Sequence, residues 1–279
     1  MRKWKFSGAI LCLLVMVCSL IPQNKVEAKT GNIPHSLTFN NNIKVKTLFY
    51  PYRDPSNITS YQAKGLQGIT VDENNNFYLT YVTGDKNHYG YIYKYNKNGK
   101  LLKKSKRLTI GHGQAISYKN GSIYQLADIR GQSSYTLYKI NATTLKVVQK
   151  WKIPSTIHPN VIAMLDSKTV MGVSKSGNGY DLNKIHLGKG INATRKWQEK
   201  IHINGLIGKT PGKEVQGFAY GKGKFYLLSN GQYMTFKPDG SQIKRVSLNT
   251  NREPEGISIT NSGRIVIGFN KVNEIFIEQ

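Results

Sequence analysis

The sequence has almost no cysteine, and its two cysteines, Cys12 and Cys18, both lie in one apolar run near the N-terminus. The rest of the chain therefore has no thiol, which excludes disulfides and cysteine nucleophiles there. Without such cross-links the protein must be stabilised by its core, and about 250 residues are ample for one closed all-β domain.

Catalytic signatures are also lacking. The sequence contains no G-x-S-x-G motif, no pair of histidines at metal-binding spacing and no glycine-rich phosphate loop. No segment shows a convincing helical period, and no low-complexity linker divides the chain. These absences favour a single all-β domain without an enzymatic activity.

The apolar run Ala9–Ile21 is 13 residues long, which is too short for a comfortable membrane span. The basic residues Arg2, Lys3 and Lys5 precede it, and Val26-Glu-Ala28 follows it as a small-x-small cleavage site. This arrangement predicts a secretory signal peptide over residues 1–28, cut after Ala28, and a single secreted domain over residues 29–279. The signal and the lysine- and asparagine-rich composition indicate a Gram-positive bacterial source.

Acidic residues are scarce: 40 Lys and Arg stand against 15 Asp and Glu, a formal charge of +25. The predicted signal peptide carries a net +3, which leaves +22 (25 − 3) for the secreted domain, from Arg2, Lys3, Lys5 and Lys25 against Glu27. Solubility alone does not require so large an excess. A field of this sign favours anionic polymers or anionic membrane surfaces as partners. Nucleic acid is not expected, because the lysines are spread singly and the protein is expected outside the cell.

A repeated four-residue segment, here called the tetrad, is the clearest pattern in the chain. Each tetrad begins with an amide or carboxylate residue (its opener), continues with a small or β-branched residue and an apolar residue, and ends with Thr, Ser or Ala. The five tetrads are Gln67-Gly-Ile-Thr, Gln114-Ala-Ile-Ser, Asn160-Val-Ile-Ala, Gln216-Gly-Phe-Ala and Glu255-Gly-Ile-Ser. Their spacings are 47, 46, 56 and 39 residues (114 − 67, 160 − 114, 216 − 160, 255 − 216), near the period of four-stranded propeller blades. The sequence therefore predicts an all-β, five-bladed β-propeller; five unrelated strands that begin alike are the alternative.

Turn residues divide each blade into further strands. The third blade has the weakest pattern, and its last strand is expected at Thr194–Ile201. The fifth blade lacks an outer strand, whereas the alternating segment Ile43–Tyr50 is left over on the N-terminal side. We expect this segment to complete the fifth blade, which closes the ring and removes an exposed sheet edge.

The five openers are expected to form a polar ring at one mouth of the central channel, because the first strand of each blade lines that channel. Polar residues and a tyrosine in the preceding loops are expected at the same mouth. The candidate binding residues are therefore Gln67, Gln114, Asn160, Gln216, Glu255, His112, His158, Glu214, Glu253, Arg252 and Tyr61. Tyrosine rings beside amide donors suit sugar or polyol ligands. The alternative is that the openers only bond backbone groups and channel waters.

No cofactor is expected, and calcium is the alternative left open. Calcium takes six to eight oxygen ligands, for which Glu214, Glu253 and Glu255 are the available carboxylates. His112 or His158 beside Glu214 has the residue types of a base and an acid. No nucleophile accompanies them, so no catalytic residue is predicted.

The first blade opens with Gln67-Gly-Ile-Thr-Val-Asp-Glu-Asn-Asn-Asn-Phe-Tyr-Leu-Thr, and the last contains Glu253-Pro-Glu-Gly-Ile-Ser-Ile and Asn273-Glu-Ile-Phe-Ile. These stretches resemble the Q-G…D…G-N-I-Y-I blade opening and the E-x-E-x-I…N-E-I-Y terminus of the helveticin-J-like bacteriocins. The resemblance covers the first blade and the last two blades best. It implies a secreted propeller with antibacterial activity, although similar openings also occur in lactonase-like and esterase-like propellers.

Two functions remain open at this stage. The first is non-enzymatic binding of anionic polymers of the Gram-positive cell envelope by a monomeric, strongly basic propeller, with a membrane surface as a further partner. A bacteriocin-like antibacterial action belongs to this first function. The second is a secreted lactonase- or esterase-like hydrolase with a metal at the channel mouth.

Overall fold

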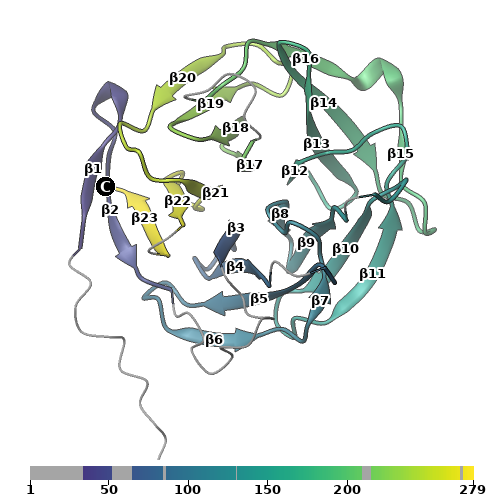
Figure 1. Ribbon diagram of the computed structural model, residues 1–279, viewed down its shortest axis with the longest axis horizontal. Helices are drawn as coiled ribbons and strands as arrows, with labels where there is room; N and C mark the ends of the chain where they lie inside the picture. Colours follow the sequence, from purple (N-terminus) through teal and green to yellow (C-terminus); the bar gives the residue numbers. More distant parts are fainter. Residues whose placement is uncertain (1–33, 52–64, 84–85, 130, 209–214, 271–272) are drawn as a thin grey trace, which may run out of the picture. The chain divides into compact units, whose positions relative to one another are not determined.

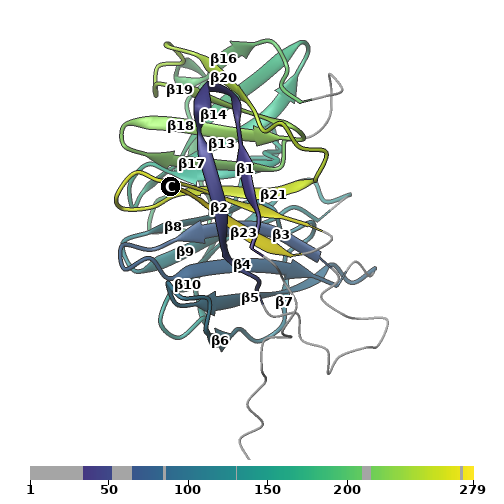
Figure 2. The same ribbon diagram turned by 90° about the vertical axis from the view of Figure 1, so that its left-hand side faces the viewer.

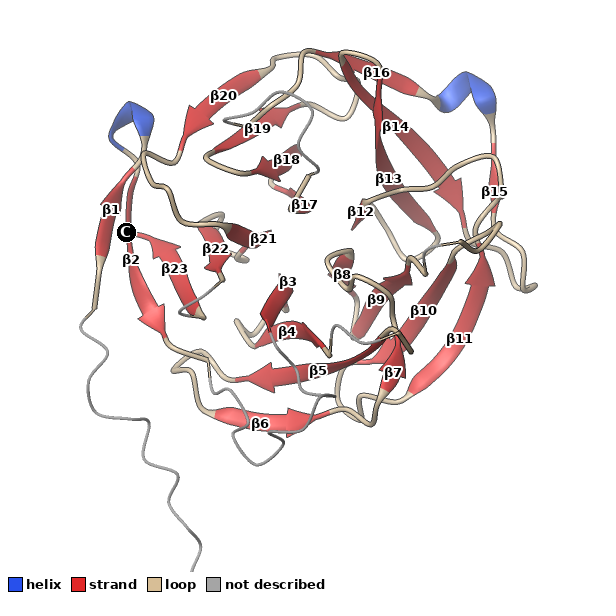
Figure 3. Cartoon of the chain, viewed as in Figure 1, coloured by secondary structure: helices blue, strands red, loops and turns tan. Residues whose placement is uncertain are grey.

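The computed structural model describes residues 34–51, 65–83, 86–129, 131–208, 215–270 and 273–279. Asn32–Gln279 form one compact unit. In the described residues the chain is built from β-strands and two short 3-10 helices, η1 (Asn40–Asn42) and η3 (Trp197–Glu199) (Figure 3). None of the helices described is long and apolar enough to cross a membrane. The predicted signal peptide lies outside the described residues.

Five antiparallel sheets surround a central axis, and each is a blade (Figure 1). Blade 1 contains β3 (Gly65–Val71), β4 (Phe77–Val82), β5 (Tyr89–Tyr95), β6 (Leu101–Lys104) and β7 (Leu108–Thr109). Blade 2 contains β8 (Ile116–Lys119), β9 (Ser122–Ala127), β10 (Thr136–Asn141) and β11 (Val147–Lys152). Blade 3 contains β12 (Val161–Met164), β13 (Thr169–Ser176), β14 (Gly179–His186), β15 (Thr194–Arg195) and β16 (Ile201–Asn204).

Blade 4 contains β17 (Gly217–Gly221), β18 (Lys224–Ser229), β19 (Gln232–Phe236) and β20 (Lys244–Ser247). Blade 5 contains β21 (Pro254–Ile259), β22 (Ile265–Phe269), β23 (Glu274–Glu278), β2 (Lys44–Phe49) and β1 (Ser36–Thr38). The innermost strands contact one another in the cyclic order β3, β8, β12, β17 and β21, and β21 returns to β3. The predicted five-bladed β-propeller is therefore confirmed.

The outer edge of blade 3 differs from the prediction. The expected strand Thr194–Ile201 is wrong: β15 ends at Arg195, η3 follows, and the edge resumes at β16. The alternation in β16 explains its position, because Ile201 and Ile203 turn toward the core while His202 and Asn204 are exposed. The prediction stopped where this alternating segment begins.

The second position of the tetrad is glycine in blades 1, 4 and 5, where the innermost strands approach closely. A Cβ atom on Gly68 would lie 2.9 Å from the backbone oxygen of Gln114, and one on Gly217 would lie 2.8 Å from the Cα atom of Gly256. At Gly256 it would lie 2.7 Å from the backbone nitrogen of Ile69, and the φ angle is +114°. Both the space and the backbone angle thus require glycine at this last position.

The fourth position of the tetrad joins neighbouring blades. The Thr70 hydroxyl accepts the Tyr118 N–H at 2.9 Å, and the Ser117 hydroxyl accepts the Met164 N–H at 3.0 Å. These bonds connect blade 1 to blade 2 and blade 2 to blade 3, so they satisfy backbone donors that the strands of one blade leave free.

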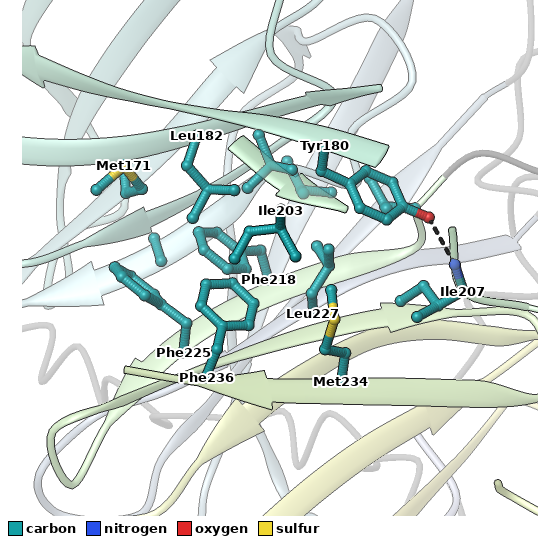
Figure 4. Packing of buried hydrophobic residues seen from close by; sticks show 14 residues of the cluster. Met171, Tyr180, Leu182, Ile203, Ile207, Phe218, Phe225, Leu227, Met234 and Phe236 are labelled. Carbon is teal, nitrogen blue, oxygen red and sulfur yellow. Dashed lines mark hydrogen bonds between the residues drawn. The ribbon is translucent and has the colours of Figure 1, made fainter. Parts of the chain in front are cut away.

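Apolar side chains fill the spaces between blades. Between blades 3 and 4, Met171, Leu182 and Ile203 pack against Phe218, Phe225, Leu227, Met234 and Phe236 (Figure 4). Burial of each such side chain contributes roughly 1.5–3 kcal/mol. In the same cluster, the Tyr180 hydroxyl accepts the Ile207 N–H at 3.1 Å, so its polar end is satisfied.

The ring is closed by a strand from the N-terminal side of the chain. β2 pairs with β23 in antiparallel register, with Val45 opposite Glu278 and Thr47 opposite Phe276. The predicted role of Ile43–Tyr50 is therefore confirmed, and β1 adds a further strand outside it (Figure 2).

A buried carboxylate, Glu274, holds this closure. Its side chain is fully buried and accepts hydrogen bonds from the Thr47 hydroxyl on β2, from His35 at 3.1 Å and from Arg252 Nη1 at 2.6 Å. Burial alone would raise the pKa of Glu274, but hydrogen bonds from Thr47, Arg252, Tyr50 and His35 lower it below its usual value. The carboxylate thus stays charged and connects β23 to both the N-terminal segment and the entry to β21.

Glu274→Gln should destabilise the propeller by about 3 kcal/mol in urea unfolding at pH 7, because it leaves Arg252 partly buried without its counter-charge. The difference in stability between the wild type and the variant should shrink in acid. Folding lowers the pKa of Glu274, so its ionised carboxylate stabilises the folded state above the usual pKa, and this stabilisation is lost as the pH falls through the folded-state pKa. Glu199→Gln is the control, because exposed ion pairs contribute little. Equal effects of the two changes would contradict the role given to Glu274.

Candidate functional site

The five openers lie at corresponding ends of the innermost strands, because each is within two residues of the first residue of its strand. Gln114 reaches farthest: its Nε2 donates to the backbone oxygen of Asn160 at 3.1 Å and to that of Val215 at 3.0 Å. It therefore connects blade 2 to the starts of blades 3 and 4. This contact joins blades rather than leaving the amide nitrogen for a ligand.

Two other openers also bond within the protein. Gln67 Nε2 donates to the backbone oxygen of Leu66 at 3.0 Å, and Gln216 Nε2 donates to Asn230 Oδ1 at 3.3 Å. Their amide nitrogens therefore serve local structure, which agrees with the alternative that openers satisfy neighbouring polar groups.

Glu255 is the opener with the most unusual electrostatics. It is only 3% exposed, its Oε1 accepts from Asn270 Nδ2 at 3.3 Å, and its Oε2 has no hydrogen-bond partner among the described residues. Burial, with a smaller contribution from the charge of Glu253, raises its pKa from the usual 4.5 to about 8, against the opposing Asn270 bond. The carboxyl is therefore mostly protonated at pH 7.

The loop residues predicted to lie together beside the openers have different partners in the structure. Arg252 pairs with Glu274 instead of Glu255, and its guanidinium lies 4.9 Å from the centre of the Phe269 ring. The exposed His112 donates its backbone N–H to Asp128 at 2.9 Å. His158 packs edge-on against the Tyr135 ring, 5.1 Å away. Tyr61 and Glu214 lie outside the described residues.

The space along the axis is small. A cavity of about 40 Å³ lies between the innermost strands, lined by Ser117, Tyr118, Phe218, Ser258 and neighbouring residues. In the described part of the chain, no three His, Asp or Glu side chains lie close enough to hold one metal ion together. The calcium alternative depended on Glu214, so it stays a prediction.

A larger cavity, of about 490 Å³, lies on blade 3. It is lined by the segment that enters β12, by the end of β13 and the start of β14, and by the edge segment around β15 and η3. We call it the blade-3 cavity, and its lining residues are Thr156, Ile157, His158, Asn160, Ser174, Lys175, Asp181, Asn183, Arg195, Trp197 and Lys200. Two predicted site residues, His158 and Asn160, therefore share a cavity, but with residues of their own blade.

The sequence reasoning missed Arg195, Trp197, Asn183 and Asp181. The available signal was the pair Arg195 and Trp197 in a blade whose strand pattern is the weakest of the five. The guanidinium carbon of Arg195 lies 3.4 Å from the centre of the Trp197 ring, a cation–π contact, although Trp197 itself is 63% exposed.

The solved structures to which the chain is similar include WD40 propeller domains. No family model and no curated protein matches it. Among solved structures it is similar to a streptogramin B lyase, with 17% identity over 85% of this chain and 72% of that chain and a TM-score of 0.41. It is similar to a chain of a nidogen/laminin complex (10% identity, 85% and 86% covered, TM-score 0.45) and to the WD40 propeller domain of Doa1 (11%, 77% and 79%, 0.41). Similarities this low support no statement about activity or ligand.

Glu255→Gln should remove a pH dependence of stability. Because the folded-state pKa is raised, the unfolded chain ionises first, so wild-type stability should fall as the pH rises from 4.5 to about 8, by at most about 1.4 kcal/mol per pH unit. Urea unfolding at pH 5, 7 and 9 measures this. The difference between variant and wild type should grow in favour of the variant up to pH 8 and then level off. A difference that does not change with pH would contradict the raised pKa.

Proposed function

We propose that this protein is a secreted, non-enzymatic propeller that binds anionic polymers of the Gram-positive cell envelope through the outer strands of blades 1 and 2. The observation that carries the proposal is a surface, here called the basic rim, on β6, β10, β11 and the adjoining turns. Its residues are Lys97, Lys100, Lys103, Lys104, Lys106, Arg107, Lys139, Lys146, Lys150 and Lys152.

The basic rim is continuous across two blades. β6 and β11 are the outermost strands of neighbouring blades (Figure 1). Lys103 Nζ donates to the backbone oxygen of Thr143 at 3.1 Å, and Lys94 Nζ donates to that of Ala142 at 3.3 Å, so the turn of blade 2 lies against the edge of blade 1. A flexible polyanion could therefore contact both blades at once.

Few acidic residues oppose this charge. Between Lys86 and Leu165 the sequence contains one acidic residue, Asp128, and its carboxylate accepts the backbone N–H of His112. In blades 3 and 5, by contrast, carboxylates pair with cations, as in Lys184–Glu199, Lys200–Asp181 and Arg252–Glu274. The positive field is therefore strongest where carboxylates are fewest, which favours association with polyanions.

The resemblance to helveticin-J-like bacteriocins supports an antibacterial outcome of such binding. Secretion, binding to cell-wall polymers and killing are separate parts of the proposal, and binding must precede killing. The hydrolase alternative depended on the three glutamates at the channel mouth. Only one oxygen of Glu255 accepts a hydrogen bond from Asn270, but the carboxyl is mostly protonated at pH 7 and so lacks the negative charge that a metal ligand supplies.

Binding to intact Gram-positive cells should weaken steeply with salt. The screening length falls from about 8 Å at physiological ionic strength to about 3 Å at 1 M, so attraction by exposed lysines is lost first. Cell pull-down at increasing salt measures this, and stripping of anionic wall polymers should abolish the binding. Binding that is indifferent to both treatments would refute the proposal.

The quadruple change of Lys97, Lys100, Lys106 and Lys146 to Gln should weaken binding to cells by about tenfold or more, because four charges leave the basic rim. The matched control changes four exposed lysines of blade 4 to Gln: Lys222, Lys224, Lys237 and Lys244. Both variants lose the same charge, so the proposal requires a clearly larger loss for the rim variant. Equal losses would show that the whole field, and not this surface, determines binding.

A further inference from the structure

We infer that the blade-3 cavity is a binding site for a small hydroxylated oxyanion, meaning a phosphate or carboxylate group with a hydroxyl group beside it. The cavity volume of about 490 Å³ is that of ordinary small-molecule sites. The inference goes beyond the proposed function, because it concerns a defined pocket in blade 3 and does not depend on the basic rim.

Arg195 is the residue that points to an oxyanion. Its Nε and Nη2 atoms are buried and have no hydrogen-bond partner among the described residues. These two nitrogens form one edge of the guanidinium, whose parallel N–H bonds match the two oxygens of a carboxylate or phosphate. Arg195 as a whole is half-buried, but these two N–H groups are without acceptors, which is costly, so a ligand that supplies two acceptors would be favoured.

The orientation of Arg195 is fixed by its surroundings. Its backbone lies in β15, which pairs with the end of β14 through Ile185 and His186. Its guanidinium lies against the Trp197 ring, which limits rotation of the planar group. Burial lowers the pKa of Arg195, and the charge of Asp181 offsets this only in part. Asp181 itself accepts hydrogen bonds from His202 at 2.8 Å and from Lys200 Nζ at 3.2 Å.

The other polar groups select the rest of the ligand. Asn183, on β14, is only 3% exposed, and its Oδ1 has no hydrogen-bond partner among the described residues. An amide oxygen accepts a hydrogen bond, so it fits a ligand hydroxyl and not the anionic group itself. The cavity lining has three basic side chains, Lys175, Lys200 and Arg195, but only one carboxylate, Asp181. Its net positive charge favours an anion over a metal cation.

The exposed face of Trp197 adds a place for carbon atoms of the ligand. The ring is 63% exposed although it belongs to the cavity lining. Aromatic rings pack well against the apolar faces of sugars and polyols. The combined requirements are two oxyanion acceptors, one hydroxyl donor and a carbon face, as in phosphorylated polyols and acidic sugars.

The experiment titrates the protein with glycerol 1-phosphate, glucuronate, inorganic phosphate and glycerol, and follows the tryptophan indole N–H signals by NMR. The sequence has three tryptophans, Trp4, Trp151 and Trp197. Trp197→Phe assigns the Trp197 signal, and Trp151, whose indole donates to the backbone oxygen of Gly188 at 2.8 Å, is an internal reference. We expect glycerol 1-phosphate or glucuronate to shift the Trp197 signal and glycerol to leave it unchanged. The better of the two anions identifies the oxyanion as phosphate or carboxylate.

Arg195→Met should weaken binding of the better anion by about tenfold to a hundredfold, as expected for loss of charged hydrogen bonds. Arg195→Lys should also weaken it, because lysine keeps the charge but lacks the two parallel donors. Asn183→Ala should weaken binding of the hydroxylated anion and leave binding of inorganic phosphate unchanged. Arg264→Met, which removes an exposed arginine from blade 5, is the matched control and should leave binding unchanged.

Several results would overturn the inference. One is the absence of any Trp197 shift with all four probes up to about 10 mM in the wild-type protein, which does not depend on the folding of any variant. Another is an equal loss of binding in Arg195→Met and Arg264→Met. Survival of small-anion binding in the rim variant, together with loss of its cell binding, would separate this site from the proposed function. Absence of small-anion binding in the wild-type protein, together with loss of cell binding in the rim variant, would overturn this inference and retain the proposed function alone.

Discussion

The innermost strands approach one another so closely that a Cβ atom cannot be accommodated at Gly68, Gly217 or Gly256 without displacing a neighbouring strand. This constraint explains why the tetrad repeats. The glycines at its second position let the strands approach, and the hydroxyls of Thr70 and Ser117 at its fourth position accept backbone N–H groups of the next blade. A repeat of this kind reflects the packing of the innermost strands against one another. It does not by itself indicate a ligand site.

Closure of the ring adds a second constraint, because the N-terminal strand must stay attached to the last blade. The buried carboxylate of Glu274 gathers Thr47, His35 and Arg252 from three separate segments. Arg252 was expected near Glu255, and both residues do lie near the start of β21. Two carboxyl groups compete for one arginine there, and Glu274 has three further hydrogen bonds that keep it ionised, whereas Glu255 is left with one amide and a raised pKa.

The two proposed sites differ in physical character. The basic rim is an exposed field whose strength depends on the number of charges and on salt. The blade-3 cavity is a defined pocket with directed donors and acceptors, in which Arg195 and Asn183 would supply specificity. A protein with both could associate rapidly with a polymer through the field and recognise one of its units in the cavity.

The sequence by itself determined the number of blades, most strand positions and the closing strand, because period, alternation and small tetrad residues are local consequences of strand geometry. It also indicated His158 and Asn160 as site residues, but in the channel and not in blade 3. Only the tertiary structure decided that Arg195, Asn183 and Trp197 line one cavity, since they come from β14, β15 and η3, whose packing has no period along the chain. It likewise decided the protonation of Glu255, because burial and the charge of Glu253 act through space and leave no pattern in the sequence.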